Sequence, residues 1–265
     1  MPADRTRDIR AFTSETKFLV PAAFGEPLRQ WARHHLVADP HGHGPHGDEY
    51  LTTTLYFDTP AFDVFHRRGS YGRSKYRIRR YNGSPDVFLE RKLRRPRMLT
   101  KRRTPVPLQA LAHLDADPDS WSGRWFHRRL ALRKLRPVCE ISYHRIARGI
   151  DGPSGPVRLT LDERLMAHRI ERPAFGEVSD GRPFVEGQMI LELKYRQPAP
   201  AVFKQLVEEF GLVPCAVSKY RLGMAALDAV EVPAVAATVP VAATVPVAAA
   251  APAGVRVAIT ESGRA

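Results

Sequence analysis

Charged residues recur at every second position in several short segments of this sequence, with mostly apolar residues around them. One order, Glu-x-Lys, occurs three times, at residues 15–17, 90–92 and 192–194. Side chains along a β-strand point alternately to the two faces of a sheet, so residues two apart share a face. The pattern therefore predicts strands that have one charged face and one apolar face.

The charged face carries more bases than acids. By this spacing it holds the bases Lys17, Lys75, Arg77, Arg79, Lys92, Arg158 and Lys194 and the acids Glu15, Glu90, Asp162 and Glu192. Several bases enclosed together need anions, and phosphates suit them because Arg binds phosphate oxygens in a fork and Lys supplies a compact charge. The acids could hold a divalent cation that bridges phosphate oxygens, or pair with the bases when no anion is bound. The face thus indicates a site for several linked phosphates.

A solvated outer face is the alternative explanation, because an antiparallel sheet often keeps one face in water. Two features favour an enclosed face instead. The same Glu-x-Lys order is repeated, and helical segments elsewhere in the chain could cover the apolar face. We therefore expect a closed barrel with the charges inside it.

The elements that would position these residues can be predicted from local patterns. Runs of β-branched and aromatic residues predict strands at 14–20, 50–57, 74–81, 86–93, 138–146, 157–162 and 188–195. Helical spacing appears at 202–210, closed by Gly211, and more weakly at 28–36 and 121–130. The sequence predicts an α+β fold, an antiparallel β-barrel tunnel with flanking helices.

Three shorter segments have local interpretations. Thr59-Pro60 predicts a short helix over 60–67, with Asp58 and Asp63 in capping or turn roles rather than catalytic ones. We interpret the very basic stretch 91–103 as an exposed loop that guides polyanions to the tunnel mouth. The His-rich, Gly- and Pro-rich stretch 34–46 indicates a flexible surface connection rather than a metal site.

Composition limits the class of protein. The chain has 265 residues, 43% of them hydrophobic, which is enough for one substantial core. Lys and Arg outnumber Asp and Glu by 41 to 28, so a net charge of +13 favours polyanionic partners. The two cysteines are isolated, and the N-terminus has no apolar segment of signal-peptide length, so we expect a cytoplasmic protein.

The composition changes after Asp228. Ala, Val and Pro dominate, and the unit Val-Ala-Ala-Thr-Val-Pro occurs at 235–240 and again at 241–246. Such a segment cannot bury enough surface to offset its ordering entropy, and its prolines would break a membrane-spanning helix. We predict a domain over 10–228 and a disordered tail over 229–265.

Eight segments, in this order, resemble the VTC domain (polyphosphate polymerase) family of the CYTH-like, triphosphate tunnel superfamily. They are Glu15-Thr-Lys-Phe18, Leu55-Tyr-Phe-Asp58, Lys75-Tyr-Arg-Ile-Arg79, Leu89-Glu-Arg-Lys92, Ser142-Tyr-His-Arg145, Arg158-Leu-Thr-Leu-Asp162, Leu191-Glu-Leu-Lys194 and Ser218-Lys-Tyr220. Each motif is short, but eight in family order make chance similarity a poor explanation. The resemblance implies transfer of the terminal phosphoryl group of ATP to a polyphosphate chain, with Mn²⁺ or Mg²⁺.

The resemblance also implies site residues. Phosphates would be bound by Lys17, Arg77, Arg79, Lys92, Arg145, Arg158, Lys194 and Lys219, with further contacts from Lys75, Lys101, Arg103 and Ser218. Glu192 would be the leading metal ligand, with Glu15 and Glu90 beside it. The wider superfamily often begins with Glu-x-Glu-x-Lys, whereas Thr13 stands in the first of these positions here. Fewer acids favour the polymerase over a two-metal hydrolase.

Three other functions compete with this one. A hydrolase of the same fold would cleave triphosphate or nucleoside triphosphates. A non-catalytic module would bind polyphosphate or inositol pyrophosphates, but binding an anion needs no carboxylate at Glu192. A nucleic-acid-binding protein is disfavoured because the bases follow strand spacing without the usual exposed stacking aromatics. The sequence carries no signal for an oligomeric state or for a membrane-protein partner.

Overall fold

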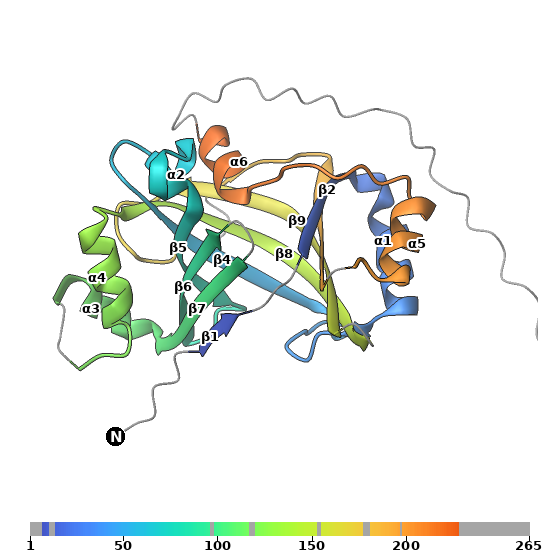
Figure 1. Ribbon diagram of the computed structural model, residues 1–265, viewed down its shortest axis with the longest axis horizontal. Coiled ribbons are helices and arrows are strands. Elements are labelled where there is room, and N and C mark those ends of the chain that lie inside the picture. Colours follow the sequence, from blue (N-terminus) through green and yellow to red (C-terminus); the bar gives the residue numbers. More distant parts are fainter. Residues whose placement is uncertain are drawn as a thin grey trace, which may run out of the picture.

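One antiparallel sheet with helices around it forms the body of the protein (Figure 1). The computed structural model describes residues 7–10, 14–95, 98–116, 120–152, 155–176, 181–196 and 198–227. The 11-stranded sheet has the order β1-β7-β6-β5-β4-β8-β9-β11-β2, while β10 pairs with β9 and β3 with β8. The predicted α+β fold is confirmed, whereas the tail predicted at 229–265 lies outside the described residues.

The strands include all seven segments predicted from the sequence. Their bounds are β1 Arg7–Arg10, β2 Ser14–Pro21, β3 Val37–Ala38, β4 Glu49–Asp58, β5 Ser74–Tyr81, β6 Asp86–Arg95, β7 Met98–Pro107, β8 Arg136–Gly152, β9 Gly155–Arg169, β10 Arg182–Pro183 and β11 Gln188–Tyr195. β1, β3, β7 and β10 were not predicted. β8 and β9 extend well beyond their predicted ranges and form a long hairpin, with a register shift between Ser142 and His144.

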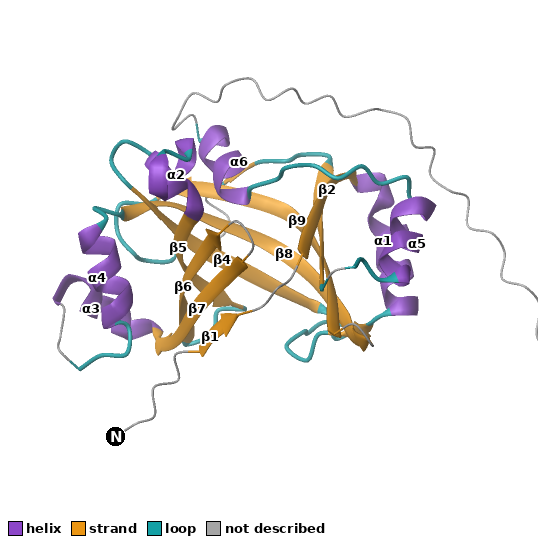
Figure 2. Cartoon of the chain, in the orientation of Figure 1, coloured by secondary structure: helices purple, strands orange, loops and turns teal. Residues whose placement is uncertain are grey.

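The helices are short and lie around the sheet (Figure 2). They are α1 Gly25–His35, α2 Asp63–His66, α3 His113–Ala116, α4 Arg124–Leu132, α5 Ala201–Glu209 and α6 Lys219–Ala226, with 3-10 turns η1 Ala22–Phe24, η2 Gly69–Arg73 and η3 Leu108–Ala112. The three helices predicted from apolar spacing correspond to α1, α4 and α5. No helix in the described ranges is long and apolar enough to cross a membrane.

Helices cover the apolar face of the sheet in two places. α1 and α5 pack on β2, β9 and β11, where Leu28 and Phe203 join a buried cluster with Phe18 and Leu191. α4 packs on the other half, and the Phe126 ring lies 5.6 Å from that of Phe57 on β4. Fully burying each such side chain contributes about 1.5–3 kcal/mol to the free energy of unfolding. Covering this face leaves the charged face on the inside of the curved sheet.

The short helix after β4 begins later than predicted. The sequence placed its first residues at Pro60, but α2 starts at Asp63, because Phe62 adopts a left-handed conformation with φ 55°. The Asp58 carboxylate accepts the backbone N–H groups of Val64 and Phe65 at 2.8 and 2.9 Å. Asp58 is therefore a buried helix-capping residue, as its predicted role required.

The basic stretch 91–103 is not an exposed loop, so that interpretation was wrong. Residues up to Arg95 continue β6, and β7 begins at Met98 and pairs with β6 in register, with Arg103 opposite Glu90. The alternation of faces continues in β7. Lys101 and Arg103 point to the charged side, whereas the Arg102 guanidinium lies 4.3 Å from the Trp125 ring of α4 on the apolar side.

Candidate functional site

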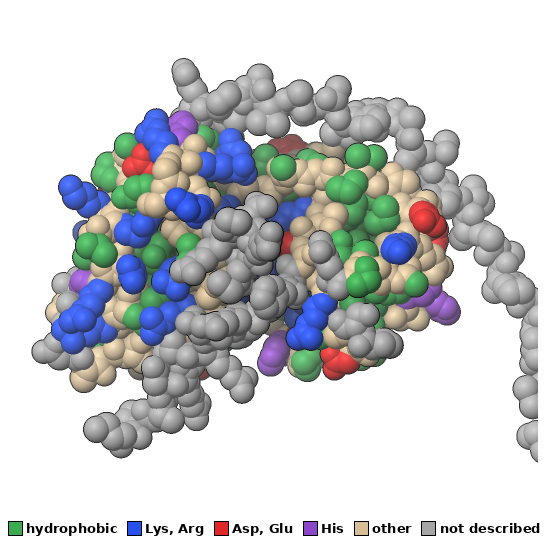
Figure 3. Space-filling view, viewed as in Figure 1, with side chains coloured by type: hydrophobic (Ala, Val, Ile, Leu, Met, Phe, Trp, Pro, Cys, Tyr) green, Lys and Arg blue, Asp and Glu red, His purple; other side chains and the backbone are tan. Residues whose placement is uncertain are grey.

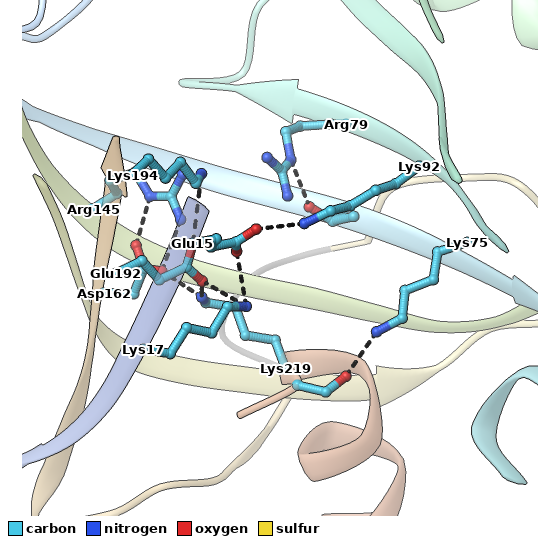
Figure 4. Close-up of polar contacts among 12 residues, drawn as sticks. Glu15, Lys17, Lys75, Arg79, Lys92, Arg145, Asp162, Glu192, Lys194 and Lys219 are labelled. Carbon is cyan, nitrogen blue, oxygen red and sulfur yellow. Dashed lines mark hydrogen bonds and ion pairs between the residues drawn. The ribbon is translucent and has the colours of Figure 1, made fainter. Parts of the chain in front are cut away.

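The predicted charged face lines the lumen, the space that the curved sheet encloses (Figure 4). Cross-strand neighbours share a face, so the register places side chains of five strands together there. In the ladders, Lys17 lies opposite Glu192, Lys194 opposite Arg158, and Lys75 opposite Lys92. Figure 4 shows the labelled bases and acids converging from β2, β5, β6, β8, β9, β11 and α6.

Glu192 lies at the centre of this arrangement, in contact with three lysines. Its carboxylate is 2.6 Å from Lys219 Nζ, 3.3 Å from Lys17 Nζ and 3.6 Å from Lys194 Nζ. Burial alone would raise the pKa of Glu192, but the charges of Lys219 and Lys17 hold it well below its usual value. Burial lowers the pKa of Lys194 to about 8 despite the nearby Glu192. Glu192 is thus held as a carboxylate, whereas burial makes Lys194 a weaker base than a lysine in water.

Arg145 and Asp162 form a second buried pair beside Glu192. Arg145 Nε and Nη2 donate to the two Asp162 oxygens at 2.6 and 2.7 Å, the bidentate geometry typical of strong Arg–carboxylate pairs. Lys219 Nζ lies 2.5 Å from the same carboxylate. The Tyr143 ring, which the sequence reasoning missed, has both Arg145 and Lys219 at 5.1 Å from its centroid. Its position inside the matching Ser142-Tyr-His-Arg145 motif could have identified Tyr143 as a lumen residue.

Glu15 joins walls of the lumen that are far apart in the sheet order. Its carboxylate is 3.1 Å from Lys17 Nζ on β2 and 2.5 Å from Lys92 Nζ on β6. Burial opposes the charge, but Lys17 and Lys92 lower the pKa of Glu15 to about 2. Among the described residues no backbone register joins the end strands β1 and β2, so this ion pair links the two sides through side chains.

Glu90 is the centre of a separate group on β5, β6 and β7. Its carboxylate is 2.7 Å from Arg77 Nε, 2.7 Å from Lys101 Nζ and 2.9 Å from Arg103 Nε, and its side chain is 1% exposed. Burial lowers the pKa of Lys101 to about 8 against the attraction of Glu90. Arg103 Nη2 also donates to the Tyr81 hydroxyl at 2.8 Å.

Two bases of the lumen lack a carboxylate partner among the described residues. Arg79 is 7% exposed, and its Nε donates to Thr54 Oγ1 at 3.2 Å. Lys75 Nζ donates to Ser218 Oγ at 3.0 Å. Arg79 is buried and Lys75 half-buried, and a positive charge removed from water without a negative partner is costly, so both positions favour the binding of an anion.

Arg158 lies apart from the other predicted bases. Its side chain is 41% exposed, forms an ion pair with Asp39, and donates from Nη2 to the Tyr50 hydroxyl at 2.8 Å. The sequence reasoning missed both partners, because they come from a loop and a strand far away in the chain. Arg158 therefore marks the edge of the lumen rather than its centre.

α6 packs on the lumen side at one end of the sheet. Tyr56 lies opposite Arg77 in the β4–β5 ladder, so both face the lumen, and the Tyr220 ring of α6 stacks on Tyr56 at 5.2 Å. A Cβ atom on Gly223 would lie 2.7 Å from Ile141 Cδ1, so glycine lets α6 approach β8 closely. Tyr220 also donates its hydroxyl to Asp58. These contacts fix Ser218 and Lys219, which precede Tyr220, against the charged region.

The three acids predicted as metal ligands do not meet at one point. Glu15 and Glu192 both contact the Lys17 ammonium, whereas Glu90 belongs to the group on β5–β7. Within the ranges that the structure describes, no group of three or more His, Cys, Asp or Glu residues is arranged to hold a metal ion, the histidines of 34–46 included. Glu15 and Glu192 nevertheless place two carboxylates around one positive charge, which is a donor set that a hard cation accepts.

Solved structures with a similar fold have low sequence identity to this chain. A Bacillus halodurans protein, provisionally assigned as an adenylate cyclase, is 18% identical over 78% of this chain and 96% of its own, with a TM-score of 0.46. A Hippeastrum protein with a dominant triphosphatase activity is 15% identical over 80% of this chain and 95% of its own, with a TM-score of 0.47. A Pyrococcus horikoshii protein is 15% identical over 79% and 97%, with a TM-score of 0.40.

The family assignment comes from the sequence itself. No curated protein matches this chain closely. The VTC domain matches residues 12–228, a stretch that contains every lumen side chain described above. The chain therefore belongs to the VTC domain family, as its eight motifs predicted.

Proposed function

We propose that this protein is an ATP:polyphosphate phosphotransferase that acts inside the lumen. The observation that carries the proposal is the imbalance of charge there. Ten bases face four carboxylates: Lys17, Lys75, Arg77, Arg79, Lys92, Lys101, Arg103, Arg145, Lys194 and Lys219 against Glu15, Glu90, Asp162 and Glu192. Several linked phosphates would supply the missing negative charge to all ten bases.

The chemistry asks little of the protein beyond alignment. A terminal oxygen of the polyphosphate attacks the γ-phosphorus of ATP, a new P–O–P bond forms, and the bond to ADP breaks with its electron pair leaving on ADP. The attacking oxygen is already deprotonated, so no general base is needed, and the protein contributes positioning and charge stabilisation. No side chain of the protein needs to form a covalent bond to the transferred phosphoryl group.

The bases fall into two classes by their partners. Arg77, Lys101 and Arg103 share Glu90, so part of their charge is offset before any phosphate arrives. Arg79 has no carboxylate partner among the described residues, and its Nε donates to the Thr54 hydroxyl, so the rest of its guanidinium would bind the phosphoryl oxygens that gain charge in the transition state. Lys219 and Arg145 would bind the neighbouring phosphate, held in place by Asp162.

A divalent cation, Mn²⁺ or Mg²⁺, is part of the proposal. Glu192 and Glu15 would hold it, since both carboxylates already border one cation, the Lys17 ammonium. When bound, the ion would neutralise charge on phosphate oxygens and so favour attack of another anion on the γ-phosphorus. Glu90 is left out of this role because three bases of β5 and β7 surround it.

One assay tests the proposal against hydrolysis and against binding without turnover. Purified protein is incubated with ATP and Mn²⁺ or Mg²⁺, and the products are separated into long polyphosphate, orthophosphate and ADP. We expect polymer and ADP to appear together, and neither in the presence of a chelator. Orthophosphate without polymer would assign hydrolysis, and unchanged ATP alongside tight polyphosphate binding would assign a binding module. We also propose a cytoplasmic location, which the free thiols of Cys139 and Cys215 support.

A further inference from the structure

The lysines of the lumen differ in how their charges are balanced. Five of them contact a carboxylate: Lys17, Lys92, Lys101, Lys194 and Lys219. Lys75 is different, because within the described part of the chain its polar contact is the Ser218 hydroxyl. Burial, together with the nearby charges of Lys17 and Lys92, lowers the pKa of Lys75 to about 7. Arg67, which follows α2, adds to this repulsion.

Two arginines, Arg221 and Arg67, lie between Lys75 and the protein surface and likewise lack an acidic partner among the described residues. Ser218 is the residue before α6, and Arg221 lies in the first turn of that helix, with its guanidinium carbon 5.4 Å from the Phe65 ring centroid. Its Nε is buried and has no hydrogen-bond partner among the residues that the structure describes. Arg67 is exposed, and burial together with the charge of Arg67 lowers the pKa of Arg221. Neither arginine has an ion pair with another described residue.

The acids at this end of the sheet are already engaged. Asp58 accepts backbone N–H groups of α2 and the Tyr220 hydroxyl, and it is fully buried. Asp63 contacts the Thr59 hydroxyl at 2.6 Å and Arg68 at 3.2 Å. Figure 3 shows Lys and Arg side chains gathered over α2 and α6, with little acid among them. Among the described residues, the charges of Lys75, Arg67 and Arg221 therefore have no acidic partner.

We propose that Lys75, Arg67 and Arg221 form a track between α2 and α6 that binds the part of a linear polyphosphate chain extending out of the lumen. This inference rests on the proposed function and extends it to a second subsite. A chain long enough to reach the surface would contact the two arginines, whereas a triphosphate held at Arg79 and Glu192 would not. Polyphosphate fits better than a lipid surface, because the track begins at Lys75, a half-buried lysine inside the lumen that donates to Ser218, and an extended anion can follow the charges from there to the surface.

The test is the dependence of affinity on chain length. The double variant Arg67→Gln with Arg221→Gln removes the two surface charges and keeps most of the side-chain length. Its matched control, Arg128→Gln with Arg129→Gln, removes two exposed charges from α4, on the other side of the sheet. Binding of labelled polyphosphate of several tens of units, and of tripolyphosphate, is measured for all three proteins at low and at physiological salt.

We expect the track variant to lose about tenfold in affinity for the long chain, the sum of two charge-assisted contacts, and to bind tripolyphosphate within about twofold of the unaltered protein. The loss should shrink as salt rises, since exposed charges are screened. The control should bind both ligands normally. An equal loss for both ligands, or the same loss in the control, would overturn the track.

A second measurement, binding to lipid vesicles, distinguishes polyphosphate from a membrane as the ligand of this surface. If the double variant loses binding to phosphatidylserine vesicles but keeps its affinity for long polyphosphate, the surface belongs to a membrane and the proposal is overturned. The readout is binding, so it does not depend on turnover. A protein that makes no polymer from ATP would refute the proposed function, whereas an unchanged preference for long chains would refute the track alone.

Discussion

Arg79 and Arg80 are adjacent and chemically identical, but the sheet sends them to opposite faces. Arg79 is 7% exposed in the lumen, and its Nε donates to Thr54 Oγ1 at 3.2 Å. Arg80 lies on the outer face, where its Nε donates to the Ser84 carbonyl at 2.8 Å and its Nη2 to the Gly83 carbonyl at 2.5 Å. Replacing each by Ala removes one positive charge from the same strand, so the pair controls for net charge.

The two variants should differ by about two orders of magnitude in turnover. Arg79→Ala removes a preorganised donor at the reacting phosphates, which costs about a hundredfold in kcat, or about 2.7 kcal/mol. Its melting temperature should change little, because the Arg79 charge opposes that of the neighbouring Arg77. Arg80→Ala removes two hydrogen bonds to the turn between β5 and β6. Its free energy of unfolding should therefore fall by about 1 kcal/mol, while kcat stays within a few-fold.

The assay is polymer formation from ATP with Mn²⁺, together with thermal unfolding of each variant. Arg79→Lys is a useful third variant, because it keeps the positive charge but cannot bind phosphate oxygens in the bidentate geometry of Arg. We expect its kcat to lie between those of the Ala variant and the unaltered protein. Equal losses of kcat at both positions would attribute the effect to bulk electrostatics. A loss confined to Arg80→Ala would mean that the strand register, and the lumen lining derived from it, is inverted.

Other predictions follow from the same geometry. Glu192→Gln should abolish metal-dependent turnover at any metal concentration while the protein stays folded, so near-normal activity at saturating Mn²⁺ would remove Glu192 from the metal site. Affinity for polyphosphate should fall as pH rises from about 7 to 9, because Lys75 and Lys194, with pKa values of about 7 and about 8, must be charged to bind it and take up protons on binding. Calorimetry in buffers of different ionisation enthalpy measures that uptake, and Lys75→Met should reduce it. Truncation after Asp228 should leave turnover and melting temperature unchanged, since the family match ends there, and a large drop in melting temperature would show that the removed segment packs on the domain.

Local spacing predicted the lumen lining well, because the alternation of strand faces is a property of consecutive residues. Arg79 inside, Arg80 outside, and Lys17 and Glu192 on the charged face all follow from it. The same rule failed in β7, where nearly every residue around Lys101 and Arg103 is polar. Because the neighbouring alternate positions are Thr100, Arg102 and Thr104, the charge density indicated a loop and hid the strand.

Long-range partners were beyond the reach of spacing. Arg158 was assigned to the lumen with its strand, but Asp39, from a loop more than a hundred residues earlier, pairs with it at the edge. The start of α2 depends on the left-handed Phe62 and on Asp58, whose carboxylate is held by Tyr220 from the far end of the chain. Tertiary contacts of this kind override local helix signals.

The repeated Glu-x-Lys order has a physical reason in the charge balance of the lumen. Enclosing so many bases without anions would be prohibitively costly, and each carboxylate two residues from a lysine lies on the same face to offset it. Glu15 with Lys17 and Glu192 with Lys194 show this pairing directly, at 3.1 and 3.6 Å. Glu90 differs, since its partners come from β5 and β7 rather than from Lys92, which reaches across to Glu15. The acids therefore act as internal counter-ions that a phosphate chain can replace, and a lumen built only of bases would be expected to fold poorly.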